Sequence, residues 1–506
     1  MAGKGKRERS EEKIEDVQLS SLPDCLLHRI LSFLDMKDVI RTSILSKRWR
    51  DLSTSVPNLN FNKCSTSVPN LDFNICSAEQ RNPSEVGFLR FVERALFANS
   101  ASKIHKFRLC FSRYDEKHDS HLDACIRFVM NKGVRELDLD FTVRELDLDF
   151  PTVDDRSIGY KLPCLLLNCE TLTSLKLRSC RFTAPDIARF TKLTALSLSC
   201  IPFTTFYLDD LLQGCPLLED LVLVGARVIL GSMNSLPSLQ LKRLTMKATR
   251  YSSIVIEAPN LQILKISCGS LYKSSFKDMP FLKEAYLDLS YYSLAPITFR
   301  MGPPSCLDLP FQGLCDARVL RLSSACIQVM PIPTFKDLHF NFKTKLLILR
   351  TGVQKYEMLG IANLLWSSPY LENLIIDLVP SKCIYVDKDC ELKYDFDERE
   401  YWESLTATFP CLLHHLKTIK ITGFMGGGSL DSSMEVTSFQ EKDEQIKLVK
   451  FFLKNAMVLE KMIIHVSNRP KFVEGGQWLE ILLGVTKKLV AFPRASSRAE
   501  VIFSYK

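Results

Sequence analysis

The sequence lacks several features that mark whole classes of protein. Its 506 residues contain no run of 18 apolar residues, so we expect no segment that crosses a membrane. The opening residues, MAGKGKRERSEEK, are charged and have no apolar stretch of the kind found in a signal peptide. No two of the 17 cysteines are spaced as C-x-x-C. These absences predict an intracellular protein, in the nucleus, the cytoplasm or both, whose thiols are free and mostly buried.

An excess of one charge sign is also missing. The net charge is only +8, from 66 basic and 58 acidic residues, and the Lys and Arg residues are dispersed along the chain. We therefore expect no dedicated binding of nucleic acid. With 46% apolar and 25% charged residues the composition is that of an ordinary globular protein. The length allows two to four domains, or one long array of repeats with appendages.

Residues that bind metals in other proteins do not have the required spacing here. The most metal-like group consists of Cys110, His118, His121 and Cys125. The two histidines fit one helix face, but the four residues lack zinc-finger spacing. The acidic segment 382–403 lacks the regular alternation and the glycine of a calcium-binding EF-hand loop. We predict no metal site and no cofactor.

Catalytic patterns are equally incomplete. Glycines 426–428 are not followed by the Lys and Ser or Thr of a phosphate-binding P-loop. Cys411 is followed by His414 and His415, which suggests a nucleophile and a base, but nothing in the sequence supplies an oxyanion hole. We therefore predict that the chain has no catalytic residues.

The segment 16–49 carries more apolar surface than so short a module can bury by itself. Ser21 is expected to cap a first helix, and a second helix is expected to begin near residues 37–38. The first helix presents an apolar stripe formed by Leu26, Leu27, Ile30, Leu31 and Leu34. A module of about 40 residues is marginally stable without a metal, disulfides or a partner. The stripe therefore belongs either to the first layer of a larger core or to a docking surface for another protein.

The sequence LPDCLLHRILSFLDMKDVIRTSILSKRWRDL resembles the F-box of plant F-box proteins. The resemblance rests on the LPD start, the L-x-x-I-L-S-F-L helix, the K-D-V turn and the R-T-S-x-L-S-K-R-W end. It implies a small helical module that binds a Skp-type adaptor, and through it cullin and RING subunits, while the rest of the chain holds a protein substrate. The positions that match the adaptor-facing pattern are Leu22, Pro23, Leu26, Ile30, Leu31, Leu34, Val39, Ser43, Leu45 and Trp49. Each of these side chains could instead pack between the helices of the module itself.

A repeated pattern, L-x-x-L-x-L, begins near residue 100. Between Leu172 and Leu282 its successive starts are 20–25 residues apart, which is the period of leucine-rich repeats. Each unit is expected to give one short strand and a return segment, and the stacked units form a curved solenoid with a parallel sheet. The starts are Ile104, Val134, Leu172, Leu193, Leu218, Leu241, Leu261, Leu282, Ala317, Phe335, Leu371, Leu416 and Leu459.

Alternation along each strand predicts a substrate-facing surface. Leu175 and Leu177 are expected to point into the core, and Lys176 between them is expected to point out. The outward residues of successive strands would line the concave face: Lys176, Ser197, Val222, Thr245, Lys265, Arg321, His339 and Ile375. Among these, we predict that Lys176, Lys265, Arg321 and His339 meet the substrate. The alternative is a solvated sheet face without a partner.

Two tandem duplications interrupt the pattern. STSVPNLNFNKC at 53–64 is repeated at 65–76, and VRELDLDFT at 134–142 is repeated at 143–151. Almost nothing separates the two copies of VRELDLD, so one copy is expected to form a repeat strand and the other to bulge or extend the array. Such near-identical repeats indicate recent local duplication or an error in the gene model.

The last hundred residues resemble the FBD region found at the C-terminus of many plant F-box proteins with leucine-rich repeats. The segment GGGSLDSSMEVTSFQ is longer than in that pattern. The predicted fold is α/β: a basic arm at 1–15, an F-box at 16–62, a linker with a duplicated segment and a helix at 63–99, a leucine-rich-repeat solenoid at 100–400, and an FBD-like region at 401–506 that continues the array. The predicted function is substrate recognition in an SCF-type ubiquitin ligase. The alternative is an interaction scaffold without ligase activity.

Overall fold

The computed structural model describes two compact units, Met1–Thr142 and Val143–Lys506. The residues that it describes are 19–63, 85–111, 114–141, 159–181, 189–201, 205–225, 240–247, 255–268, 274–277, 279–289, 311–330, 340–380, 402, 409–425, 437–467 and 475–505. No helix among these residues is long and apolar enough to cross a membrane. The two units are described separately below.

The first unit begins with three short helices. A 3-10 turn at Leu19–Ser21 leads into α1 (Asp24–Leu31), followed by α2 (Met36–Thr42) and α3 (Lys47–Thr54). The predicted cap at Ser21 is wrong, because α1 begins after Pro23 and has no side-chain cap. Asp35, which interrupts the apolar stripe, instead caps α2. Its Oδ1 accepts the backbone N–H groups of Lys37 at 2.9 Å and Asp38 at 3.1 Å.

Three parallel strands complete the first unit. They are β1 (Asn58–Asn62), β2 (Lys106–Cys110) and β3 (Glu136–Asp140), and their buried side chains stack in register. Helices α4 (Glu85–Phe97) and α5 (Asp119–Asn131) precede β2 and β3 and pack against each other. Parallel pairing thus begins at β1, ahead of the predicted start of the array near residue 100. The strands β1 and β3 come from the first copies of the two duplications, and the second copies lie outside the described residues.

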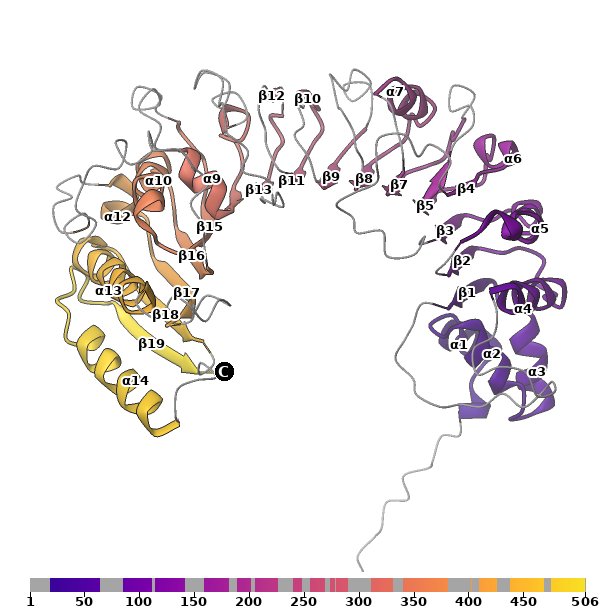
Figure 1. Ribbon diagram of the computed structural model, residues 1–506, viewed down its shortest axis with the longest axis horizontal. Helices are drawn as coiled ribbons and strands as arrows, with labels where there is room; N and C mark the ends of the chain where they lie inside the picture. Colours follow the sequence, from indigo (N-terminus) through magenta and orange to yellow (C-terminus); the bar gives the residue numbers. More distant parts are fainter. Residues whose placement is uncertain are drawn as a thin grey trace, which may run out of the picture. The chain divides into compact units, whose positions relative to one another are not determined.

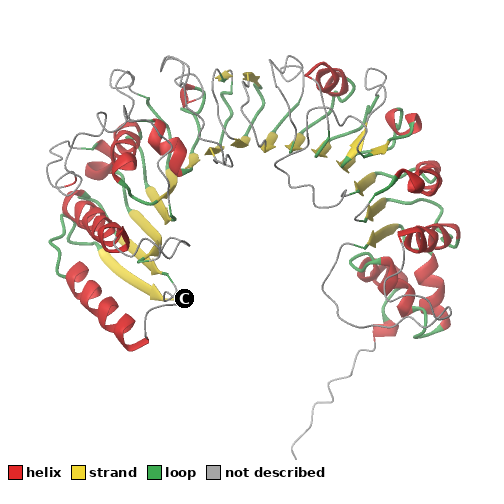
Figure 2. Cartoon of the chain, viewed as in Figure 1, coloured by secondary structure: helices red, strands yellow, loops and turns green. Residues whose placement is uncertain are grey.

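The second unit is organised around a parallel sheet, which Figures 1 and 2 show as a succession of short strands. In spatial order the strands are β5 (Ser174–Arg178), β7 (Ala195–Ser199), β8 (Asp220–Val224), β9 (Arg243–Lys247), β11 (Ile263–Cys268), β13 (Glu284–Leu289), β14 (Val319–Leu322), β15 (Leu346–Thr351), β16 (Asn373–Leu378), β17 (Thr418–Phe424), β18 (Lys461–Val466) and β19 (Glu500–Tyr505). The order in space follows the order in the chain, as stacked repeats require.

The return segments of the second unit are partly helical. Their helices are α6 (Cys164–Leu167), α7 (Thr205–Gln213), α9 (Ser324–Val329), α10 (Lys355–Ser367), α12 (Pro410–His414), α13 (Thr437–Asn455) and α14 (Gly475–Val490). Two smaller parallel pairs join β4 (Tyr160–Lys161) to β6 (Cys180–Arg181) and β10 (Val255–Glu257) to β12 (Ser275–Lys277). Figure 1 shows α10, α12 and α13 along the same side of strands β15 to β18.

The predicted ladder of leucines is confirmed. Leu175, Leu196, Leu221, Leu244 and Leu264 are direct neighbours on adjacent parallel strands, and each is at most 1% exposed. The alternating side chains on the other face of the sheet, here called the open face, are half-buried or exposed in the same strands. A period of two residues therefore separates core from surface along the array, as it does in any sheet with one covered face.

The strand β15 of the main sheet was not predicted from the sequence. Residues 335–339 of the proposed strand FKDLHF lie outside the described residues. The strand that follows β14 in the sheet is β15, from the sequence LLILRT, whose side chains alternate between half-buried and buried. The C-terminal strands β17, β18 and β19 extend the same sheet, as predicted for a region that continues the array.

Candidate functional site

The core of the three-helix module takes up three of the ten residues predicted to face the adaptor. Leu31 and Val39 are completely buried, and Trp49 is 3% exposed. They share this interior with Leu27 and Leu52. Leu31, Val39 and Trp49 therefore pack inside the module in this structure. They would influence a partner only by holding the helices that carry the exposed side chains.

The remaining seven predicted residues keep surface available. Leu26, Ile30 and Leu45 are exposed by 45%, 37% and 64% of their surface, and Pro23 is exposed as well. The other three, Leu22, Leu34 and Ser43, are half-buried. The exposed aliphatic side chains leave apolar surface that no other described residue covers.

Sequence reasoning missed the most exposed members of this surface. Phe33 is 79% exposed and Ile44 is 84% exposed, while Ile40 and Leu19 are 37% and 56% exposed. Phe33 follows Ile30 by three residues and Leu26 by seven, so helical spacing could have assigned it to the outward row. We call Leu19, Leu26, Ile30, Phe33, Ile40, Ile44 and Leu45 the apolar docking surface.

Polar contacts fix the helices beneath this surface. The guanidinium of Arg48 donates hydrogen bonds to the backbone oxygen of Leu22 at 2.6 Å and to Asp24 Oδ1. These bonds tie the start of α1 to α3. At the start of α3, Ser46 Oγ accepts the backbone N–H of Trp49 at 3.2 Å. Each helix is only about two turns long and is only marginally stable by itself. The caps and the Arg48 contacts therefore help to hold the helices, and the exposed side chains on them, in place.

In the second unit, strand pairing places outward residues in a single row across the open face. We call it the strand row: Lys176, Ser197, Val222, Thr245, Lys265, Tyr286, Arg321, Ile348, Ile375, Lys420, Ile463 and Ile502. Lys176, Lys265 and Arg321 lie in this row and are exposed. His339 lies outside the described residues, and the corresponding place between Arg321 and Ile375 belongs to Ile348.

A polar cluster lies in the strand row at β13 and β14. The guanidinium carbon of Arg321 lies 5.7 Å from the centroid of the Tyr286 ring, within range of a cation–π contact. Tyr286 Oη donates a hydrogen bond to Asp288 Oδ2 at 3.1 Å. Burial and the nearby Asp288 carboxylate raise the pKa of Tyr286, so this phenol is neutral at physiological pH.

The neighbouring charges of Arg350 on β15 and Asp377 on β16 balance each other. Arg350 Nε lies 3.7 Å from Asp377 Oδ2, and Thr422 Oγ1 donates a hydrogen bond to Asp377 Oδ1 at 2.8 Å. Arg321 differs from Arg350, because no carboxylate of the described residues lies within 4 Å of its guanidinium nitrogens. The positive charge of Arg321 is therefore available to an acidic group of a partner.

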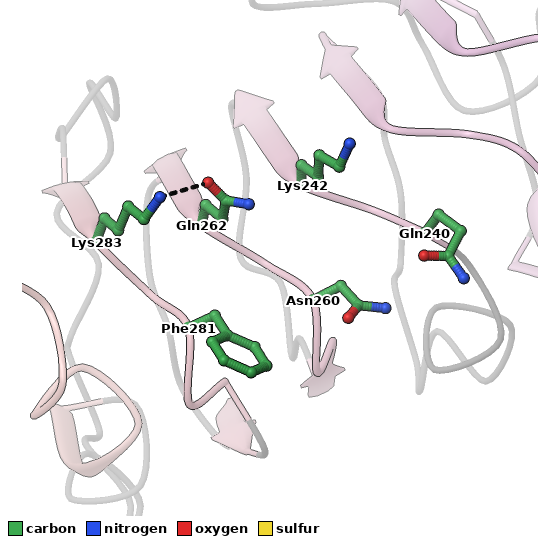
Figure 3. A pocket seen from close by; sticks show the side chains of 6 residues that line it. All are labelled: Gln240, Lys242, Asn260, Gln262, Phe281 and Lys283. Carbon is green, nitrogen blue, oxygen red and sulfur yellow. Dashed lines mark hydrogen bonds between the residues drawn. The ribbon is translucent and has the colours of Figure 1, made fainter.

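A shallow hollow of about 190 Å³ lies where β9, β11 and β13 begin (Figure 3). Its lining consists of Gln240, Lys242, Asn260, Gln262, Phe281 and Lys283. Lys283 Nζ donates a hydrogen bond to Gln262 Oε1 at 2.9 Å, and Lys242 Nζ to Glu219 Oε1 at 2.7 Å. The ring of Phe281 is 62% exposed. The lining offers amides, ammonium groups and an aromatic surface, and it contains no Ser, Thr, Cys, His, Asp or Glu side chain.

The residues weighed as a metal site hold other partners. His118 Nδ1 accepts the backbone N–H of Asp115 at 3.1 Å, and His121 Nδ1 lies 2.7 Å from Glu93 Oε1. Burial raises the pKa of the Cys125 thiol to about 12, which keeps it protonated. In the part of the chain that the structure describes, no three His, Cys, Asp or Glu side chains are grouped as metal ligands would be.

The thiol weighed as a nucleophile is also protected. Cys411 is buried, and its Sγ donates a hydrogen bond to the backbone oxygen of Leu365 at 3.3 Å. Burial raises the pKa of this thiol to about 12. A reactive cysteine needs the opposite shift, because the thiolate is the attacking species.

Family models match the chain in three places. The F-box domain matches residues 19–61, the LRR repeats of the FBD-associated F-box protein At5g56370 match residues 122–280, and the FBD matches residues 432–464. The chain therefore carries an F-box, leucine-rich repeats and an FBD region. The F-box match covers α1 to α3 and nearly all of β1, and the FBD match covers the whole of α13 and the first four residues of β18.

Proteins from Arabidopsis thaliana that are named for an F-box and LRR repeats are similar to most or nearly all of this chain. The F-box/FBD/LRR-repeat protein At5g53840 is 27% identical over 99% of this chain and 98% of its own length. The F-box/FBD/LRR-repeat protein At1g78750 is 25% identical over 99% of this chain and 100% of its own length. The F-box/LRR-repeat protein At4g14103 is 29% identical over 72% of this chain and 93% of its own length.

Proposed function

We propose that this F-box protein is the substrate-recognition subunit of an SCF-type cullin-RING ubiquitin ligase. Its apolar docking surface binds a Skp-type adaptor, which connects it to the cullin and RING subunits. Its strand row holds a protein substrate. The chain contributes no catalytic group and accelerates ubiquitin transfer only by holding substrate near the catalytic partners.

The observation that carries this proposal is the exposure of large apolar side chains on the small helical module. Phe33, Ile44 and Leu45 each leave more than three fifths of their surface in contact with water. Exposing this much aliphatic and aromatic surface is unfavourable by about 25 cal/mol per Å², so a covering partner is strongly favoured. The F-box match at residues 19–61 indicates that this partner is a Skp-type adaptor.

The experiment is co-purification of the full chain with a Skp-type adaptor. Changing Leu26 and Ile30 to Asp should abolish co-purification, because two charges would be buried without partners at the interface. The melting transition of the repeat region should be unchanged. Leu479→Asp is a matched control, because Leu479 is 67% exposed on α14, outside the helical module. Unchanged adaptor binding by the double variant would contradict the proposal.

A further inference from the structure

The FBD and the leucine-rich repeats contribute to one continuous strand row. Ile375 of β16 is in register with Lys420 of β17, Lys420 with Ile463 of β18, and Ile463 with Ile502 of β19. Ile463 lies within the FBD match, and Arg321 lies four strands away in the same sheet. The FBD is therefore a part of the open face in this structure, with side chains directed to the same side as those of the repeats.

The strand row changes character along its length. From β5 to β14 its members are mainly polar or basic, and Lys176, Lys265 and Arg321 are exposed. From β15 to β19 its members are isoleucines with one exception, Lys420. Each of these isoleucines is half-buried, so each keeps apolar surface that a partner could cover.

We propose that β14 to β18 bind one amphipathic helix of the protein substrate, with the FBD contributing Ile463 to the apolar half of the site. Acidic side chains at one end of the helix meet Arg321, and aliphatic or aromatic side chains lie over Ile348, Ile375 and Ile463. This inference rests on the proposed function and names the class of substrate segment that the strand row recognises.

The charge on the partner follows from the pairing on this face. Arg350 is already balanced by Asp377, whereas Arg321 contacts the ring of Tyr286 and no carboxylate of the described residues. Stacking on Tyr286 holds the guanidinium in place, which lowers the entropy lost when it binds a carboxylate. An acidic residue on the partner would find this arginine unpaired and partly ordered.

The spacing of the row favours a helix over an extended segment. Neighbouring strands lie about 4.8 Å apart, so the row presents one side chain at this interval. One turn of a helix rises about 5.4 Å, which nearly matches the spacing between neighbouring strands. Side chains on one face of an extended segment are about 6.7 Å apart and would lose register within two strands. The distance from Arg321 to Ile463 is four strand spacings, on the order of 19 Å, or about 13 residues of helix.

The test uses the full chain and a phage-displayed library of 16-residue helical peptides. We expect enriched peptides to share apolar residues at helical spacing, with Asp or Glu at one end of that stripe. Ile375→Asp and Ile463→Asp should each weaken the binding of a selected peptide at least tenfold, and Leu479→Asp should not. Should an Asp variant melt earlier than the wild type, Ile375→Ala and Ile463→Ala provide milder changes, with a loss of at least threefold expected.

A charge exchange tests the polar end independently. Arg321→Glu should weaken the binding of an acidic peptide at least tenfold. Changing the acidic residue of that peptide to Lys should restore its binding to the Arg321→Glu variant. The inference is wrong if no enriched peptide depends on Ile375 and Ile463, or if the charge exchange has no effect. Adaptor co-purification is measured in the same preparations. Failure of peptide binding with adaptor binding intact contradicts only the helix site, whereas loss of adaptor binding by the wild type contradicts the proposed function.

Discussion

Leu26 and Leu27 are adjacent in α1, yet Leu27 is completely buried and Leu26 is 45% exposed. A rotation of about 100° per residue places the two side chains on different sides of the helix. Leu27 stabilises the module from within, and Leu26 belongs to the apolar docking surface. The predicted adaptor-facing residues divide in the same way, so stability and adaptor binding should respond to different substitutions.

Trp49→Ala should destabilise the helical module by about 3–5 kcal/mol, because it removes a large side chain from a closed core. Phe33→Ala should leave the stability unchanged and weaken adaptor binding, since Phe33 is 79% exposed. Urea denaturation and adaptor binding measured on both variants check this separation. The outcome that contradicts it is a Phe33→Ala variant that unfolds earlier and binds the adaptor as the wild type does.

Asp35→Ala should lower the stability of the first unit by about 0.5–2 kcal/mol, because α2 loses the acceptor of two backbone N–H groups. Asp35→Ser or Asp35→Asn should restore most of the loss, since both can cap a helix. Thermal unfolding followed by circular dichroism gives the comparison. Equal stability of the Ala and Asn variants would show that the cap contributes nothing.

Leu221→Ala should cost about 2–5 kcal/mol, because Leu221 is completely buried between Leu196 and Leu244 on neighbouring strands. Val222→Ala is the matched control in the same strand, since Val222 is half-buried on the open face. Its effect should be much smaller. Chemical denaturation of the full chain measures both, and a Val222→Ala variant that loses as much stability as Leu221→Ala would refute the assignment of faces.

Reversing the charges of Lys176, Lys265 and Arg321 together should remove an identified substrate while the adaptor and the fold are retained. These three side chains are exposed in the strand row, and none is part of the core. The measurement is ubiquitination of the substrate in a reconstituted ligase, with adaptor binding as the control. A triple variant with the wild-type rate would show that recognition lies elsewhere, for example in the acidic segment 382–403.

The buried thiols should resist modification up to strongly alkaline pH. Burial raises the pKa values of Cys125, Cys215 and Cys411 to about 12, from an ordinary value of 9.0. Between pH 9 and pH 12 these thiols lose their protons in the unfolded protein but keep them in the folded protein. The stability that each buried thiol contributes is therefore complete below pH 9 and is lost as the pH rises to 12. At pH 8, a thiol reagent should label the exposed Cys25 and leave these three unmodified until denaturant is added.

Mass spectrometry of the labelled protein, with and without denaturant, measures which cysteines have reacted. Labelling of Cys411 in the native protein at the rate of Cys25 would contradict its burial. It would also reopen the idea of a reactive cysteine next to His414 and His415.

The repeat period, the alternation along strands and the F-box resemblance could all be read from the amino-acid sequence, because each depends on local order. Leucines at 175, 196, 221, 244 and 264 had to share one face, since only alternate side chains of a strand face the same side. The cap of α1 was misplaced from sequence, because Ser21 and Pro23 both suit a helix start and local chemistry does not choose between them.

Tertiary structure decided which apolar residues of the helical module are core and which are surface. From the sequence, every apolar residue of the stripe is an equally good candidate for the core. Only the packing of the neighbouring helices determines that Leu31 is covered and that Phe33 is not. Register across strands likewise put Ile348 in the place given to His339 and aligned Ile463 with Ile375 through Lys420. Sequence determines the side on which a residue lies, whereas its neighbours across the sheet depend on the lengths and paths of the return segments between strands.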